Sequence, residues 1–339
     1  APLAARSRML PGMAEYVPPS DAPEWHAHYS MLRAPRPRKL SSLRTTLDQK
    51  AVSAISDQSG NLRPAAQAFV DAVQETTSIR SACSAAGLKR IERIADILDN
   101  ATKEHSRSYI DPGMWGVFAR GAQRNYEGAK VRFLHEQLCT RGTNEVALRK
   151  MQQPTVCEVG FCAGLSAMLF MESLPRARYV GWDLGDIGWT ESNIELMRRA
   201  YGERFLGVAL GFAASTIPLY QQAHPELKCD VVYIDGAKGY NPHMLNLVDM
   251  RNMSTPGSTL LLFDEATSEA CVNGTLREGD PTCSGRTDKK GMGVHGSARA
   301  YNRASRAGLI RVKGCAKTPY QDESLGNRMD TLCVGEYAM

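Results

Sequence analysis

The sequence predicts an α/β fold built around a mostly parallel sheet. From residue 154 onward, short apolar runs that suit buried strands alternate with longer stretches of helical periodicity, the pattern of successive βαβ units. The first apolar run, at 155–159, passes through the glycine turn Gly160–Gly164 into a helix. Hydrophobic residues make up 43% of the 339 residues, which is enough for the core that such a sheet requires.

Seven strands are expected along this part of the chain. Parallel neighbours require right-handed crossovers, so helices should cover both faces of the sheet. A polar, glycine-rich insertion at 267–294 follows the fifth strand and is placed to act as a lid or substrate wall. The expected strands are 155–159, 178–182, 205–210, 229–234, 258–263, 308–314 and 329–335.

Two segments precede the sheet domain, which is expected at 151–339. Residues 1–62 are rich in proline and lack hydrophobic periodicity, so they predict an extended arm that is a candidate contact for another protein. Residues 63–150 are expected to form a helical cap. Within it, apolar spacing predicts two amphipathic helices that break at Ala86–Gly87, and a third helix from about Tyr126 to Thr140.

Charge and hydropathy exclude two kinds of partner as defaults. The net charge of +5 is small for this length and no domain-sized basic face is evident, which disfavours nucleic acid. No apolar run approaches the ~20 residues of a membrane-spanning helix.

The nine cysteines include no C-x-x-C pair, which argues against a zinc ribbon or a thioredoxin-type site. Together with glycosylation sequons at Asn100, Asn252 and Asn273, they favour a disulfide-bonded glycoprotein in the secretory lumen or outside the cell; a cytoplasmic or organellar location is the alternative. At least one bridge is expected, and the favoured pairs are Cys271–Cys283 or Cys315–Cys333. Cys162, in the glycine turn, is expected to stay a thiol.

The glycine turn itself indicates a nucleotide-like cofactor. An acidic residue stands near the tip of the first strand in the spacing Glu158-x-Gly160-x-x-x-Gly164, and parallel sheets bind ligands at the carboxyl ends of their strands. A dinucleotide fingerprint would instead read G-x-G-x-x-G and place a helix N-terminus against a pyrophosphate. The turn therefore predicts a cofactor that needs no phosphate cradle.

Six blocks in order resemble the class I S-adenosylmethionine-dependent methyltransferases, and among them the small-molecule O-methyltransferases of the catechol O-methyltransferase type. This resemblance implies a Rossmann-like seven-stranded sheet with helices on both faces, an antiparallel last strand, and S-adenosylmethionine as cofactor. The blocks are 125–130, 158–167, 179–183, 211–215, 229–238 and 258–265.

The resemblance also implies the cofactor-binding residues. An acid at the tip of the second strand, Asp183, would hold the ribose hydroxyls, and the segment at 211–215 would edge the adenine. The full expected set is Asn125, Tyr126, Glu158, Gly160, Gly164, Ser166, Asp183, Ala214 and Ser215.

The catalytic residues are expected beyond the fourth and fifth strands. The resemblance makes Lys238 the general base beside Asp235, and His243 is an alternative base. Asp235, Asp264 and Glu265 would offer oxygen ligands to Mg²⁺ or Ca²⁺. Glu265 departs from the family, which has an amide at that place, so a reaction without a metal is the alternative.

The predicted function is methyl transfer to a hydroxyl of a small molecule or sugar. The alternative from another class is a non-catalytic scaffold or assembly subunit that keeps the fold. The presence of every motif residue, from Glu158 to Lys238, favours the enzyme.

Overall fold

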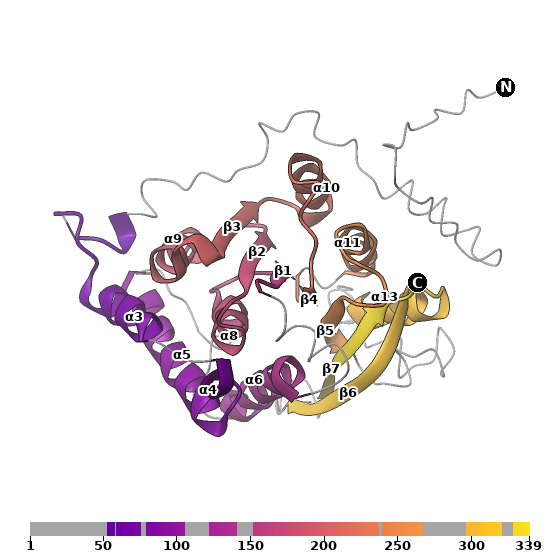
Figure 1. The fold of residues 1–339 in the computed structure, drawn as a ribbon, viewed down its shortest axis with the longest axis horizontal. Coiled ribbons are helices and arrows are strands. Elements are labelled where there is room, and N and C mark those ends of the chain that lie inside the picture. Colours follow the sequence, from indigo (N-terminus) through magenta and orange to yellow (C-terminus); the bar gives the residue numbers. More distant parts are fainter. Residues whose placement is uncertain are drawn as a thin grey trace.

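The structure is a computed structural model that describes residues 53–57, 59–75, 79–105, 122–140, 152–236, 239–266, 296–320 and 328–339. These residues form three layers, in which helices cover both faces of a central sheet (Figure 1). The α/β class expected from the alternation of strands and helices is confirmed.

Seven strands of the described chain make one sheet in the order β3-β2-β1-β4-β5-β7-β6. The pairs among the first five are parallel, and β7 runs antiparallel to both β5 and β6. Every expected strand is present, with shifts at the ends. The strands are β1 Thr155–Val159, β2 Arg178–Asp183, β3 Phe205–Leu210, β4 Val231–Ile234, β5 Leu260–Ala266, β6 Ile310–Tyr320 and β7 Arg328–Tyr337.

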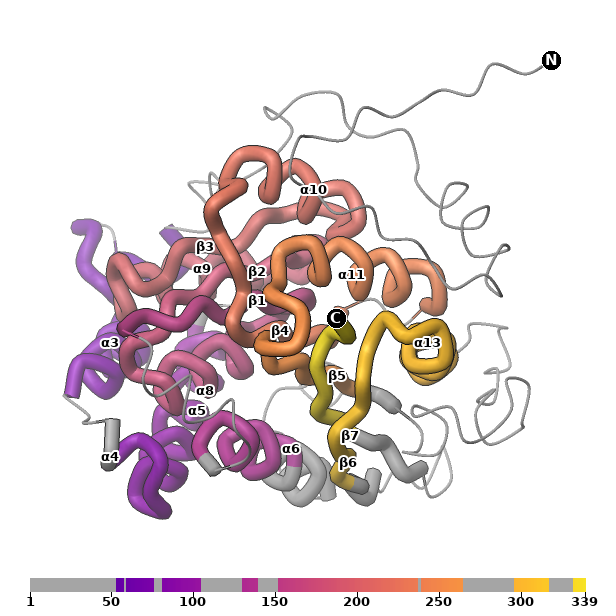
Figure 2. The backbone as a smooth tube through the Cα atoms, turned by 45° about the vertical axis from the view of Figure 1, so that its right-hand side comes forward, coloured from indigo at the N-terminus to yellow at the C-terminus, as the bar shows by residue number. Residues whose placement is uncertain are grey.

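The helices divide between the two faces of the sheet, as both views show (Figures 1 and 2). One face carries α3 Pro64–Gln74, α4 Ile79–Ala82, α5 Ala85–His105, α6 Ala122–Thr140, α8 Leu165–Ser173 and α9 Thr190–Tyr201. The other carries α10 Ala213–Ala223, α11 Tyr240–Asn252 and α13 Gly296–Arg306.

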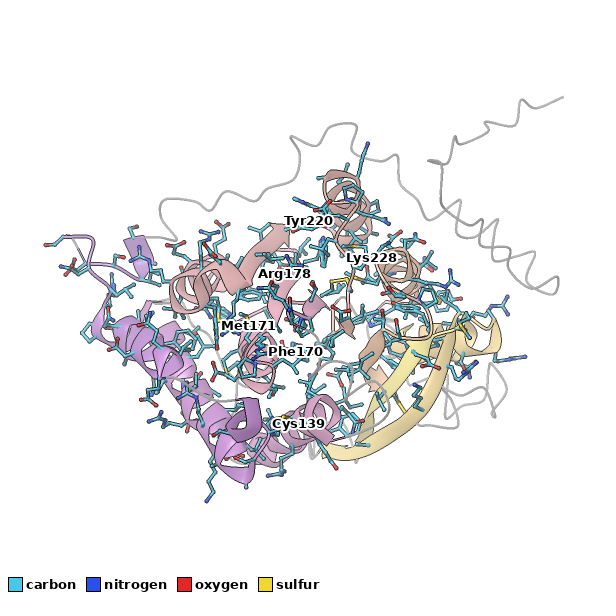
Figure 3. All side chains as sticks on the ribbon, in the orientation of Figure 1. Cys139, Phe170, Met171, Arg178, Tyr220 and Lys228 are labelled. Carbon is cyan, nitrogen blue, oxygen red and sulfur yellow. A yellow bond between two sulfur atoms is a disulfide. The ribbon has the colours of Figure 1, made fainter. Side chains whose placement is uncertain are left out.

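Each face buries its own hydrophobic cluster, because successive side chains of a strand point to opposite faces. On β2, Tyr179 belongs to the α8 side and Trp182 to the α10 side, and both are fully buried. Among the side chains labelled in Figure 3, Phe170 and Met171 on α8 belong to the first cluster and Tyr220 on α10 to the second. This double burial fixes the register of the sheet and hence the edge that carries the site.

The helices at 64–138 share the α8-side cluster with the sheet, and Ile55, from the expected arm, is buried in the same cluster. The rest of the arm, residues 1–52, and the expected insertion at 267–294 lie outside the described residues. Within the part of the chain that the structure describes, no helix is both long and apolar enough to cross a membrane.

The predicted helix break at Ala86–Gly87 is wrong. The interruption lies just before α5, where the side chain of Ser84 accepts a hydrogen bond from the Gly87 N–H at 3.1 Å and so caps the helix. Gly87 is required for a different reason: a Cβ there would stand 2.1 Å from the carbonyl oxygen of Ala82. The short helix α4 therefore packs closely against the start of α5, and the chain is already helical at Ala86–Gly87.

The described residues contain three disulfides, Cys83–Cys139, Cys157–Cys229 and Cys315–Cys333. The last of these, between β6 and β7, agrees with the sequence-based expectation, and Cys162 is a thiol as expected. The expected Cys271–Cys283 bridge lies outside the described residues. The other two pairs link residues 56 and 72 positions apart, which spacing along the sequence does not indicate.

Candidate active site

The candidate residues gather at the carboxyl edge of the sheet, around β1. This strand pairs with β2 on one side and with β4 on the other, so the chain leaves it in one direction and later returns on the opposite side. Open α/β sheets bind ligands in the crevice that such a switch in strand order creates.

The turn after β1 is fixed by two glycines. Gly160 has φ of 103°, and a Cβ there would lie 2.4 Å from the carbonyl oxygen of Asp235 at the end of β4. Gly164, with φ of 81°, precedes the first residue of α8. Both positions need a residue without a side chain, and the turn therefore lies in backbone contact with the neighbouring strand end.

Asp183 lies at the tip of β2, as expected, and its carboxylate is held by the backbone. One oxygen accepts a hydrogen bond from the Cys162 N–H at 2.8 Å, and the other accepts one from the Gly185 N–H at 2.8 Å. A carboxylate has about four lone-pair sites, so each oxygen can accept a further bond. The side chain is thus aimed by the glycine turn and can still receive two hydroxyl groups.

Glu158 lies beneath the turn and is fully buried. The hydroxyls of Ser166, on α8, and Tyr179, on β2, both donate to its carboxyl group. Burial raises the pKa of Glu158 to about 8, while the two hydroxyl donors act in the opposite direction. A buried carboxyl of this kind is costly to ionise unless a cation approaches it, which is a property of ligand sites.

The ends of β2 and β3 present apolar surface beside Asp183. Leu184 is 56% exposed and Phe212 is 47% exposed, although both are large hydrophobic side chains. Ala214 and Ser215 stand in the first turn of α10, directly after Phe212, and are partly exposed. This edge therefore offers a partly apolar surface next to a fixed carboxylate.

Beyond the turn, the ends of β4 and β5 bring Asp235 and Asp264 together. Both carboxylates bind the ammonium of Lys130 on α6: its Nζ lies 2.8 Å from Asp235 Oδ2 and also contacts Asp264 Oδ2. The Tyr233 hydroxyl donates to the same Asp235 oxygen at 3.0 Å. The three charged side chains are 15%, 20% and 5% exposed, in the order Lys130, Asp235 and Asp264.

This arrangement does not fit the divalent metal that the sequence predicted. Two of the three expected ligands already bind a lysine ammonium that lies between them, and Mg²⁺ requires oxygen ligands in a nearly octahedral set. Among the described residues there is no group of three or more metal-ligand side chains. The described contacts thus support a carboxylate–ammonium cluster at this place.

The structure does not bring every expected residue to the site. His243 is 1% exposed and its ring packs at 5.4 Å against Tyr301 of α13, so an acceptor cannot reach it in this conformation. Lys238 lies outside the described residues. The side chains of Asn125, Tyr126 and Glu265 also lie outside them; the backbone places the first two in α6 and the third in β5.

Two functional side chains escaped the sequence-based prediction, namely Lys130 and Tyr179. Lys130 belongs to the block at 125–130, but nothing in its spacing indicates that it reaches a residue 105 positions away. Tyr179 read as an ordinary strand residue because its hydroxyl partner, Glu158, is on the neighbouring strand. The contacts of Lys130 depend on the packing of α6 against the sheet, and that of Tyr179 depends on the pairing of β1 with β2.

No protein-family model matches the chain, and no curated protein sequence matches it. Solved structures with a similar fold include an O-methyltransferase from Bacillus cereus in complex with SAH, 14% identical, covering 80% of this chain and 96% of that chain at a TM-score of 0.43. Another is the O-methyltransferase TomG from Streptomyces achromogenes in complex with SAM, 16% identical, with coverages of 72% and 99% and a TM-score of 0.45.

A third similar structure is a putative O-methyltransferase from Klebsiella pneumoniae, 14% identical, with coverages of 80% and 96% and a TM-score of 0.46. These identities and TM-scores are too low to support a fold assignment, which therefore rests on the strand order and on the antiparallel direction of β7. On those two observations, the chain has the Rossmann-like sheet that the resemblance to class I methyltransferases implied.

Proposed function

We propose that the protein is an S-adenosylmethionine-dependent methyltransferase that methylates a hydroxyl group of a small molecule or sugar. The observation that carries this proposal is the turn after β1, whose backbone binds the carboxylate of Asp183 while its glycines lie against the end of β4. A fixed carboxylate beside a close-packed glycine turn suits a nucleoside with two vicinal hydroxyls.

Each side of the turn would bind a different part of the cofactor. Asp183 would accept hydrogen bonds from the ribose hydroxyls, and the apolar edge at Leu184 and Phe212 would cover the adenine. Ser166, at the start of α8, is partly exposed and its hydroxyl donates to the fully buried Glu158, so Glu158 would act on the cofactor through Ser166.

When bound, the cofactor would supply a sulfonium methyl group. The hydroxyl oxygen of the acceptor would form a bond to the methyl carbon while the carbon–sulfur bond breaks and its electron pair returns to sulfur. The chain must align the acceptor, exclude water and remove the hydroxyl proton. Lys238 is the proposed base on the strength of the sequence resemblance. We derive no step through a metal, because Lys130 binds the expected ligands.

We also propose an oxidising compartment, the secretory lumen or the extracellular space. Support comes from the three disulfides of the described residues, since such bonds persist mainly outside the cytosol. The glycosylation sequon at Asn100 is exposed on α5, which is compatible with that location.

The cofactor proposal is tested by titrating the full chain with S-adenosylmethionine in a calorimeter. Asp183→Asn should weaken binding by about 1–3 kcal/mol, because a charged acceptor for two hydroxyls is lost while the side-chain shape is kept. The matched control is Asp71→Asn, which changes an exposed carboxylate on α3 and should leave the affinity unchanged. Equal affinity in wild type and Asp183→Asn would remove Asp183 from the site.

The acceptor is then found by following S-adenosylhomocysteine production over a panel of phenols, sugars and aliphatic alcohols. Turnover with a hydroxyl compound would support O-methyl transfer. Binding of the cofactor without turnover across the whole panel would favour the non-catalytic scaffold.

A further inference from the structure

We propose that the Lys130 ammonium is the resident cation of this site and occupies the position that the resemblance assigns to a divalent metal. The proposal rests on the proposed function, because it names the residue that holds together the two carboxylates at the acceptor end of that site. Lys130 is then a positioning residue, since it acts through Asp235 and Asp264.

The contacts enclose the ammonium on several sides. It binds an oxygen of Asp235 from β4 at 2.8 Å and an oxygen of Asp264 from β5, and it lies 5.8 Å from the centre of the Tyr233 ring. Lysine is seldom this buried without paired carboxylates, and here only 15% of its side chain is exposed. Lys130 of α6 therefore links the ends of the two parallel strands β4 and β5.

The ammonium and a divalent cation would exclude each other. Both would have to lie between the same two carboxylates, those of Asp235 and Asp264, and an ammonium nitrogen is itself no ligand. Placed together they would repel strongly, because the surroundings are largely buried and weakly screened. A lysine at this point thus offsets part of the charge of the carboxylates without a divalent ion.

The charge of the cluster indicates what it can bind. The three described side chains of the cluster, two carboxylates and one ammonium, carry a net charge of −1 between them. A net negative cluster accepts hydrogen bonds from neutral hydroxyls and disfavours a deprotonated, anionic oxygen. These three side chains therefore favour an acceptor that arrives as a neutral alcohol or sugar.

The test uses Mn²⁺ as the probe, with the unbound ion measured by electron paramagnetic resonance against the full chain. Wild type should bind no Mn²⁺ at the cluster. Lys130→Met removes the ammonium but keeps the length of the side chain, and should raise the affinity for one Mn²⁺ on the order of tenfold or more as the repulsion is lost. Adding Asp264→Asn to that variant should abolish the gain.

Two control variants separate this effect from a general loss of lysine. Lys130→Arg keeps the cation and should bind no Mn²⁺. Lys103→Met removes a lysine that pairs with a single carboxylate, Asp99, on α5, and should also bind none. Where Lys130→Met fails to fold by circular dichroism, Lys130→Gln keeps a donor to both carboxylates and takes its place.

Stoichiometric Mn²⁺ binding by wild type that Asp264→Asn abolishes would overturn the proposal, and so would unchanged affinity in the folded Lys130→Met and Lys130→Gln variants. These readouts do not use S-adenosylmethionine. A protein that binds no cofactor but shows the predicted Mn²⁺ pattern would therefore refute the proposed function and leave the position of Lys130 intact.

Discussion

Glu158→Gln replaces a fully buried carboxyl group with an amide of the same shape and removes its ionisation. Burial is the main cause that raises the pKa of Glu158 to about 8, and the negative charge of Asp235 acts in the same direction. The hydroxyls of Ser166 and Tyr179 and the charge of Lys130 lower the pKa but do not outweigh burial. The wild-type fold must therefore ionise this group as the pH rises, whereas the variant has nothing to ionise.

The sign of the effect follows from the two pKa values. The folded value of about 8 lies above the ordinary value of 4.5, so the stabilisation is fully present below the ordinary pKa and is lost as the pH rises through 8. Between about pH 6 and pH 9, wild type should lose roughly 2–3 kcal/mol of unfolding free energy from this group alone. Glu158→Gln should lose none at this position.

The assay is equilibrium unfolding in urea at both pH values, with the disulfides intact and tryptophan fluorescence as the probe. The quantity compared is the change in unfolding free energy between the two pH values, in wild type and in Glu158→Gln. Glu92→Gln, which alters an exposed carboxylate on α5, is the control and should follow wild type. An identical pH dependence in wild type and Glu158→Gln would refute the argument that Glu158 is protonated in the fold.

Two further predictions concern the turn and the cysteines. Gly160→Ala should cost about 3 kcal/mol of stability, because its Cβ would meet the backbone at the end of β4. Gly207→Ala is the control: its φ of 123° is also strained but the space around it is open, so it should cost about 1 kcal/mol. Equal costs would contradict the close approach of Gly160 to β4. Peptide mapping without reduction should find Cys157 linked to Cys229, while Cys162 should react slowly with iodoacetamide near neutral pH, because burial raises its pKa to about 12. Fast alkylation of Cys162 in the folded protein would show that the turn is open.

Most of the sheet could be predicted well because its inner strands, β1, β2, β4 and β5, are largely buried on both faces and have continuous apolar runs. β1 and β3 begin and end at the expected residues, 155–159 and 205–210. β6 and β7 extend further than expected. Their antiparallel pairing continues into polar residues at the strand ends, where hydropathy does not indicate a strand. The direction of β7 came from the family resemblance, since periodicity along one strand says nothing about its neighbours.

The site could be predicted only in part. Residues that close a turn or end a strand, such as Gly160 and Asp183, carry a local signal, because the backbone conformation there demands them. The partners of Asp235 and Asp264 carry none: Lys130 comes from a helix far away in the sequence and meets them only through the packing of α6 against the sheet. The sequence predicts a metal there because it shows the two carboxylates but does not show that the ammonium of Lys130 pairs with them.

The central claim is that the turn after β1 and the tips of β2 and β3 hold the cofactor. Amide hydrogen exchange with and without S-adenosylmethionine measures this directly, because a bound ligand protects the backbone that it covers. The predicted result is slower exchange at residues 160–166, 183–185 and 212–215, with no change in α3 at 64–74. Unchanged exchange at those three segments with saturating S-adenosylmethionine, or protection confined to other parts of the chain, would contradict it.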